Sequence, residues 1–155
     1  MNKEYCPICG EQALKHEIKP VPYNYKGHTF TIDQPAEWCS ACGEGIIQPE
    51  DNKAVQARIQ HEKALIDGLL TPQQIQKIRK FLKLNQKEAS RLFGGGVNAF
   101  NRYEKGKTPI PKPLSLLLTI LEKHPGQLDE LQEYVDNFTH KQTLKRSQAT
   151  DRNHS

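Results

Sequence analysis

Two copies of the motif C-x-x-C-G limit what this chain can fold into more than any other feature of its sequence. They read Cys6-Pro7-Ile8-Cys9-Gly10 and Cys39-Ser40-Ala41-Cys42-Gly43, and 29 residues lie between Cys9 and Cys39. Each C-x-x-C turn directs both sulfurs toward one ion, so two such turns can close a tetrahedral site. The glycine after each second cysteine lets the loop turn sharply and point backbone N–H groups at sulfur. The pair predicts one metal site, bridged by a β-hairpin, with four ligands: Cys6, Cys9, Cys39 and Cys42.

Free thiols, a redox dithiol and a mononuclear iron site are the competing interpretations of these cysteines. Free thiols are disfavoured because a domain this small needs a staple. A thioredoxin-like dithiol lacks the βαβ pattern that such a site requires. Iron accepts four thiolates, as in rubredoxins, but nothing else in the sequence suggests electron transfer. We therefore expect one structural Zn²⁺ per chain, closed to water, with His16 and His28 as surface residues.

The composition argues against a membrane protein. Hydrophobic residues make up 35% of the chain and the mean hydropathy is -0.75, so no apolar run approaches the roughly 18 residues that a membrane span needs. The first residues, Met1 to Cys6, have no apolar stretch after their charges, and no secretory signal is visible. A cytoplasmic location is expected, and disulfides are rare in that compartment.

The net charge of +4 is distributed unevenly along the chain. Residues 71–126 carry 11 basic and 3 acidic side chains, a net charge of +8, whereas residues 1–50 carry 4 and 7. A concentrated positive field attracts a phosphate backbone, while a merely solvated surface usually mixes the two signs. The charge therefore favours a nucleic-acid partner for the second half of the chain.

The predicted fold class is α+β, with a small zinc-stapled β domain followed by an all-α helix-turn-helix domain. Strand-like residues between Leu14 and Ile32, with prolines nearby, indicate β structure in a zinc-binding domain at 1–50. Residues 51–70 are predicted to form a connecting helix or linker, and 71–138 the DNA-binding domain. Residues 139–155 have few large apolar side chains and are expected to be a disordered tail.

Helix-start signals mark the second half. Thr71-Pro72-Gln73-Gln74 predicts a cap and a helix to about Leu82, with Ile75, Ile78, Phe81 and Leu82 facing inward. Asn85 and Glu88 predict a capping box for the next helix, which the three glycines 94–96 end. A short helix from Val97 to Lys105 should then stop at Gly106. The run Leu114–Leu121 is apolar nearly all round and is expected in a core and a subunit interface.

The segment from Gln86 to Gly106 reads as helix, tight turn, helix. Small Ala89 permits a close crossing, and Val97 and Phe100 can anchor the second helix. Outward side chains on that helix are suited to base edges in the major groove, with Asn on adenine and Arg on guanine. The predicted base-reading residues are Asn98, Asn101 and Arg102, and the predicted phosphate contacts are Gln86, Lys87 and Lys105. The alternative is a basic, solvated helical bundle in which these side chains have no role.

The two knuckles, the segment Leu84–Ser90, the run Phe93-Gly94-Gly95-Gly96-Val97-Asn98-Ala99-Phe100 and the motif Arg102-Tyr103-Glu104-Lys105-Gly106 closely resemble the MqsA (YgiT-type) antitoxin family. The resemblance covers about residues 5–138, and the C-terminal motif is also similar to the wider Xre/Cro group. It implies an N-terminal zinc domain that binds a ribonuclease toxin and a C-terminal domain that dimerises and represses the operon. It also implies base reading by Asn98 and Arg102.

The expected function is therefore that of an antitoxin in a type II toxin–antitoxin system. Such a protein binds its cognate toxin and, as a homodimer on a palindromic operator in double-stranded DNA, represses its own operon. A solitary zinc-containing transcription regulator is the first alternative, and an iron electron-transfer protein is the second. An enzyme is least favoured, because no convergent nucleophile, base and oxyanion arrangement can be argued from these residues.

Overall fold

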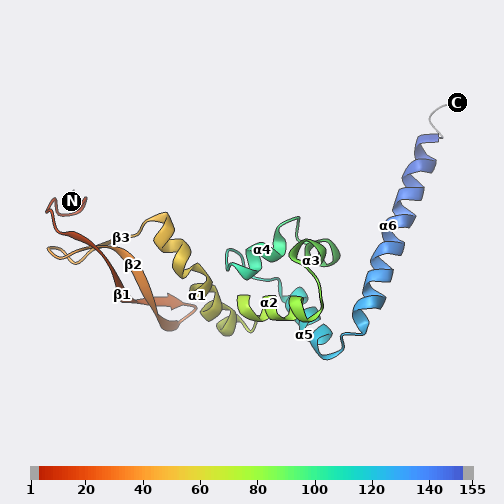
Figure 1. Ribbon diagram of the computed structural model, residues 1–155, viewed down its shortest axis with the longest axis horizontal. Coiled ribbons are helices and arrows are strands. Elements are labelled where there is room, and N and C mark those ends of the chain that lie inside the picture. The colour runs from red at the N-terminus through yellow and green to blue at the C-terminus, as the bar shows by residue number, and fades with distance from the viewer. Residues whose placement is uncertain (1–3, 152–155) are drawn as a thin grey trace. The chain divides into compact units, whose positions relative to one another are not determined.

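The computed structural model describes residues 4–151 and shows a three-stranded antiparallel sheet followed by six helices (Figure 1). The predicted α+β class is confirmed. The sheet order is β1-β2-β3. The elements are β1 (Leu14–Tyr25), β2 (His28–Cys39), β3 (Gly45–Ile46), α1 (Pro49–Asp67), α2 (Pro72–Phe81), α3 (Gln86–Phe93), α4 (Ala99–Glu104), α5 (Lys112–Lys123) and α6 (Gln127–Asp151).

The chain packs as two compact units. The N-terminal unit reaches to Gln74 and also includes Arg102–Ile110, and the helical unit consists of Ile75–Asn101 and the chain from Pro111 onward. The sequence analysis expects one boundary near residue 70. In the structure, Arg102–Ile110 also packs in the N-terminal unit; this segment contains the end of α4 and the loop after it. No local sequence pattern signals such a long-range contact.

The long hairpin of β1 and β2 dominates the N-terminal unit. Two strands of 12 residues are joined by Lys26 and Gly27, whose φ angles of 48° and 79° identify the two-residue turn that matches the right-handed twist of the strands. From this turn the register runs unbroken from Tyr25 opposite His28 to Leu14 opposite Cys39. The β structure expected at this position is therefore longer and more regular than the sequence suggests.

The prolines of the hairpin lie where the sheet tolerates a missing N–H. Pro20 and Pro22 belong to β1, which is an edge strand. Pro35 lies in β2, but β3 pairs with β2 only at Glu37 and Trp38, so the outer side of β2 at Pro35 is not covered by β3. Proline is confined to such positions in sheets, which explains how a proline-rich segment forms a long hairpin.

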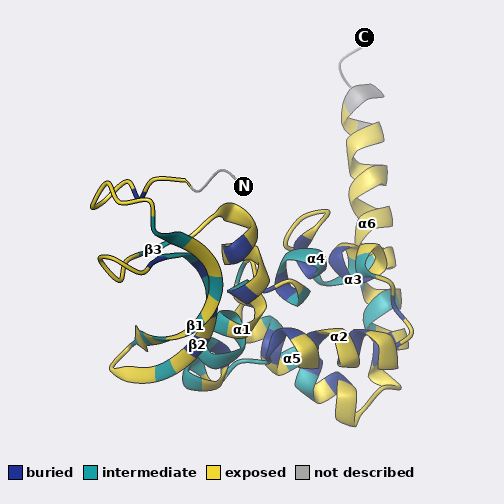
Figure 2. Ribbon diagram, turned by 60° about the vertical axis from the view of Figure 1, so that its left-hand side comes forward, coloured by how far each residue is buried: buried dark blue, intermediate teal, exposed yellow. Residues whose placement is uncertain are grey.

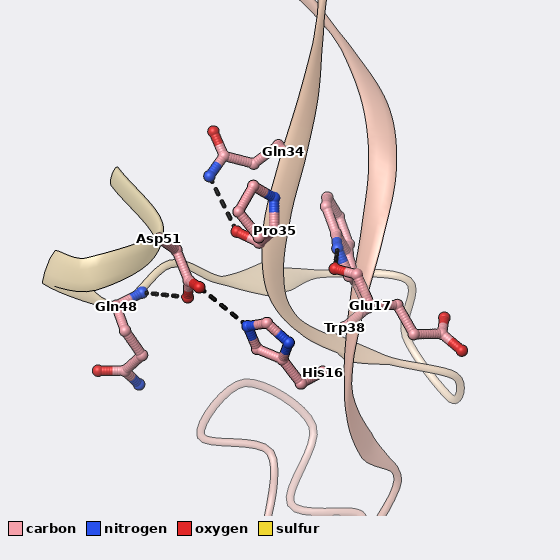
Figure 3. Close-up of polar contacts among 7 residues, drawn as sticks. All are labelled: His16, Glu17, Gln34, Pro35, Trp38, Gln48 and Asp51. Atoms are coloured by element: carbon pink, nitrogen blue, oxygen red, sulfur yellow. Dashed lines mark hydrogen bonds and ion pairs between the residues drawn. The ribbon is translucent and has the colours of Figure 1, made fainter. Parts of the chain in front are cut away.

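Helix α1 is tied to the hairpin near both of its ends. At its start, His16 Nε2 lies 2.9 Å from Asp51 Oδ1, while Asp51 Oδ2 accepts a hydrogen bond of 3.1 Å from the Gln48 backbone N–H (Figure 3). Asp51 thus caps the helix and holds β1 at once. At the other end, Tyr25 Oη donates to Asp67 Oδ2 at 2.9 Å, and Lys26 forms an ion pair with the same carboxylate.

The capping signals read from the sequence are confirmed in α2 and α3. The Gln74 N–H donates to Thr71 Oγ1 and the Thr71 N–H to Gln74 Oε1, and Asn85 and Glu88 exchange the equivalent pair of bonds, both at 2.8 Å. Side chains of α2 to α6 form the core of the helical unit; the buried apolar members include Ile75, Ile78, Leu82, Leu84, Ala89, Ala99, Phe100, Leu118, Leu121 and Leu128.

Two predicted core residues are on the surface instead. Phe81 is 54% exposed and Val97 is 78% exposed. Phe81 is the last residue of α2, and Leu82 directly after it is buried in its place. Val97 lies in the turn before α4, which begins two residues later than predicted, so Val97 has no helical face with which to reach the core.

Helix α6 continues through Asp151, where the sequence analysis expects a disordered tail from 139 to 155; residues 152–155 lie outside the described part of the chain. Nearly all described residues beyond its first turns are exposed, as Figure 2 shows. Lys, Gln, Leu and Ala are good helix formers, so this segment can be helical without burying a face.

Within residues 4–151 no helix has the length and apolar character of a membrane span.

We expect the His16–Asp51 pair to make the stability of the N-terminal unit depend on pH. The hydrogen bond that His16 donates to the Asp51 carboxylate, helped by the charges of Asp51 and Glu37, raises the pKa of His16, and the same bond lowers the pKa of Asp51. The stabilisation that protonated His16 gives the N-terminal unit is complete below the ordinary pKa of histidine and is lost as pH rises through the raised pKa. The stabilisation from ionised Asp51 is present above the ordinary carboxyl pKa and is lost as pH falls through the lowered pKa.

The measurement is urea unfolding followed by the fluorescence of Trp38, the single tryptophan, at pH 5.5 and pH 8.5. The native chain should lose more stability between these pH values than His16→Gln, which cannot carry the charge. Metal binding changes with pH in both proteins, so the difference between them isolates the pair. Equal pH dependence would show that the pair contributes nothing.

Candidate metal centre and nucleic-acid interface

The hairpin register brings the two cysteine knuckles together. The first knuckle ends at Gly10, shortly before β1 begins at Leu14, and the second begins at Cys39, the last residue of β2. Because Leu14 pairs with Cys39, the chain entering β1 and the chain leaving β2 emerge side by side. The Ser40 N–H donates to the Ala13 carbonyl at 3.0 Å and extends this pairing past the strands. A separation of 29 residues in sequence thus becomes direct contact.

The two knuckles have the same backbone geometry. The Gly10 N–H donates to the Cys6 carbonyl at 2.8 Å, and the Gly43 N–H donates to the Cys39 carbonyl at 2.8 Å. The φ angles of Gly10 and Gly43 are 78° and 80°, in the left-handed region that favours glycine. This explains why each motif continues as C-x-x-C-G.

A second pair of hydrogen bonds closes each loop. The Cys6 N–H donates to the Glu11 carbonyl at 2.8 Å, and the Cys39 N–H donates to the Glu44 carbonyl at 2.9 Å. Beyond the second loop, β3 returns across Trp38, whose ring leaves no room for a Cβ at Gly45. The first cysteine of each knuckle is buried and the second is exposed.

The four sulfurs fit the corners of a tetrahedral site. Cys6 Sγ lies 3.8 Å from Cys42 Sγ, Cys9 Sγ lies 3.7 Å from Cys39 Sγ, and all four sulfurs lie within 4.8 Å of one another. Four sulfurs bound about 2.3 Å from one ion would stand about 3.8 Å apart. All four cysteines are unpaired thiols, at a separation far beyond a disulfide bond. The cluster can therefore hold one metal ion with a complete set of protein ligands.

The environments of Cys39 and Cys42 shift their thiol pKa values in opposite directions. Backbone hydrogen bonding from Cys42 is the main cause that lowers the pKa of the Cys39 thiol to about 7, so this sulfur is partly ionised near neutral pH. At Cys42, backbone hydrogen bonding from Glu44 acts in the lowering direction, but partial desolvation and the neighbouring sulfurs outweigh it and raise the pKa to about 12. Adjacent thiolates repel one another, so full ionisation of the cluster requires a bound metal ion, whose uptake releases protons.

Helices α3 and α4 form the predicted helix-turn-helix, and a buried serine joins them. Ser90 Oγ donates to the Gln86 carbonyl at 2.8 Å and accepts the Phe100 N–H at 3.2 Å. The Phe93 and Phe100 rings lie 5.9 Å apart between centroids, and Ala89 is fully buried, as the close crossing requires. Sequence reasoning missed Ser90; its signal is a hydroxyl one turn after Gln86, where it can bond a helical carbonyl.

The candidate DNA contacts lie on α3, on α4 and in the adjoining turns. Asn98 is exposed in the turn directly before α4, and Arg102 lies on α4 itself, half-buried. Lys87 on α3 and Lys105 after α4 are exposed. The Asn101 side-chain amide donates to Gln86 Oε1 at 3.3 Å, so these two predicted contacts are bonded to each other. Asn98 is placed by the turn and Arg102 by the helix.

We predict that the four cysteines hold one metal ion per chain and that this ion supports the hairpin. Cys39→Ser should abolish metal retention and unfold residues 5–45, because the site supplies folding energy to a small core, while the helical unit stays folded. Elemental analysis and hydrogen exchange of the full-length protein would measure both effects. Ser40→Ala, adjacent in the same loop, is the matched control and should retain the metal. A Cys39→Ser protein with a protected hairpin would contradict the prediction.

Comparison with known proteins identifies the family. Residues 4–132 match the family described as the antitoxin component of bacterial toxin-antitoxin system, MqsA. The chain is 40% identical to Antitoxin MqsA of Escherichia coli (strain K12) over 129 residues, which cover 81% of this chain and 98% of that protein. The matched range, residues 4–132, spans both cysteine knuckles and the helix-turn-helix. The chain therefore belongs to the MqsA family of antitoxins, components of bacterial toxin–antitoxin systems.

Proposed function

We propose that this antitoxin binds a cognate ribonuclease toxin through its N-terminal unit and represses its own operon by sequence-specific binding to double-stranded DNA. The observation that most supports DNA binding is a helix-turn-helix with Asn98 exposed at its turn and Arg102 on its second helix, within a segment of net charge +8. The chain acts by binding, in the cytoplasm. Each part of the proposal rests on a separate feature of the molecule.

We assign the metal as structural Zn²⁺. Both zinc and iron accept four thiolates, so sulfur geometry alone does not separate them. An electron-transfer role needs a site coupled to redox partners, whereas this cluster joins the two ends of a hairpin. A closed set of four protein ligands leaves no position for a substrate, which suits a structural ion. A colourless protein that contains zinc supports this assignment, and a red one with a reversible redox couple overturns it.

In the DNA complex we assign base reading to the turn and to α4. The Asn98 amide matches adenine N6 and N7, and the Arg102 guanidinium matches guanine O6 and N7. Asn101 adds a base contact from the same helix, and its hydrogen bond to Gln86 couples it to the start of α3. The DNA phosphates are contacted by Gln86, Lys87 and Lys105. Such contacts position the protein on the DNA without reading its sequence.

Exposed apolar side chains of the helical unit support a homodimer on a palindromic operator. Within this unit, Leu116 and Ile120 of α5 are 55% and 54% exposed, and Tyr134 of α6 is 69% exposed. Ile120 and Tyr134 border one cavity of about 460 Å³ between the two helices. Apolar side chains four residues apart on an uncovered helix face suit a second copy, and two-fold symmetry doubles the base contacts of one short reading helix.

The first 50 residues suit a basic protein partner. They carry 7 acidic and 4 basic side chains, which makes them a poor surface for phosphate. An RNA-cleaving toxin is expected to have a basic surface, and complementary charge steers such an encounter. The alternative is a solitary transcription regulator with a supporting zinc domain. The presence of a small toxin gene beside this one discriminates between the two functions.

Asn98→Ala and Arg102→Ala should each weaken operator binding by roughly 1–3 kcal/mol and leave binding to random DNA nearly unchanged, because a bidentate base contact is lost. Lys87→Ala should instead weaken all sequences about equally and make the salt dependence shallower, because one phosphate contact is lost. Fluorescence titrations of the promoter duplex and a scrambled duplex of equal length, at several salt concentrations, would measure both effects. An equal loss on both duplexes in Arg102→Ala would reassign Arg102 to phosphate.

The toxin prediction uses the full chain. The protein encoded beside this gene should bind native antitoxin and Arg102→Ala with equal affinity, and it should fail to bind Cys39→Ser, because only the last variant loses the hairpin. Calorimetry with each purified antitoxin would test this, with Ser40→Ala as control. Toxin binding that survives in Cys39→Ser would place the toxin surface outside residues 5–45 and refute this division of labour.

A further inference from the structure

The loop that follows α4 lies directly against the backbone of α1, inside the N-terminal unit. Gly106 is buried there, and a Cβ built on it would come within 2.8 Å of Ala57 Cα, 3.1 Å of the Gln56 carbonyl oxygen and 3.1 Å of Gln60 Cβ. No real Cβ contact is as short as the first of these, and its target is helix backbone. Only a glycine allows the loop to approach α1 this closely.

The loop is also bound tightly to the end of α4. The Gly106 N–H donates to the Tyr103 carbonyl at 3.2 Å, and the Lys107 N–H donates to the Arg102 carbonyl at 2.9 Å. Tyr103 and Ile110, on either side of the loop, are buried. A displacement of the loop therefore pulls on the carbonyl of Arg102 itself.

The surface on which Gly106 rests is held in place from the other side. Asp51 and Asp67, near the two ends of α1, bond to His16 and to Tyr25 and Lys26 of the hairpin. The contact at Ala57 lies between them, in the middle of the helix. Next to it, α1 and Glu104 at the end of α4 border a cavity of about 320 Å³, so the helices do not pack closely at that point.

We propose that α1 is a positioning element for DNA reading, which holds the C-terminal end of α4, and with it Arg102, through the contact with Gly106. The inference rests on the proposed DNA-binding function and adds to it a role for α1. Operator affinity then depends on residues of α1, to which no DNA contact is assigned. Gly106 and α1 act through Arg102 and are not themselves base-reading groups.

A simpler explanation is that Gly106 is needed only for its φ angle of 70°. Two substitutions separate the explanations. Gly106→Asn tolerates the left-handed conformation but retains the clash with Ala57. Gly68→Ala is the matched control, since Gly68 has nearly the same φ, 69°, with nothing within 4 Å of its built Cβ. Strain at φ should affect Gly68→Ala and Gly106→Ala alike, while the contact with α1 is lost only at Gly106.

The experiment measures affinity for the duplex upstream of the gene and for a scrambled duplex, using full-length variants with native circular dichroism and native metal content. We expect Gly106→Ala and Gly106→Asn to lose about tenfold in affinity for the promoter duplex, within the range of one base contact, and little on the scrambled one. Gly68→Ala should bind as the native protein does. Native affinity in Gly106→Asn, or an equal loss in Gly68→Ala, would overturn the proposal.

A double-mutant cycle with Arg102→Ala tests whether the effect passes through Arg102. If α1 positions this side chain, Gly106→Asn should cost little further affinity once Arg102 is absent; additive losses would show that it acts elsewhere. The cycle also separates two failures. If Arg102→Ala binds the promoter duplex normally, the DNA-binding proposal fails. If Arg102→Ala loses affinity and Gly106→Asn does not, only the positioning role fails.

Discussion

The register of one hairpin determines whether this protein has a metal site. Two strands of equal length and a two-residue turn place Leu14 opposite Cys39, and only then do sulfurs from the two knuckles stand 3.7 and 3.8 Å apart. A slip of one residue would move a knuckle by about 3.3 Å along the strand and turn every side chain to the opposite face. The turn and the cysteine cluster therefore require the same register at opposite ends of the hairpin.

The hairpin in turn fixes the orientation of helix α1. It is bonded to β1 near its start by the Asp51 carboxylate and to the hairpin turn near its end by the Asp67 carboxylate. Both carboxylates lie on a helix that has few buried apolar side chains of its own. Polar bonds at fixed points thus orient α1, where an apolar stripe alone would allow it to slide. This gives the middle of the helix a defined surface for the loop at Gly106.

Features encoded locally could be read from the sequence, and features created by distant contacts could not. The knuckles, both capping boxes and the close crossing at Ala89 each depend on a few neighbouring residues, and the structure confirms them. The exposure of Val97 and Phe81 depends on where a turn ends, which periodicity locates only to within one or two residues. The bond between Asn101 and Gln86 and the return of Arg102–Ile110 to the N-terminal unit join residues far apart in sequence, and no local pattern reports them.

The interleaved order of the two units bears on how the chain folds during its synthesis. The hairpin can close and take up metal once Cys42 has been made, since all its ligands are then present. The N-terminal unit is complete only when Ile110 has been made, after the whole first segment of the helical unit, Ile75–Asn101. At usual elongation rates the ribosome needs several seconds for that stretch. During this interval the nascent chain can bring its four cysteines together but lacks the loop that packs against α1, so the N-terminal unit is completed in two steps.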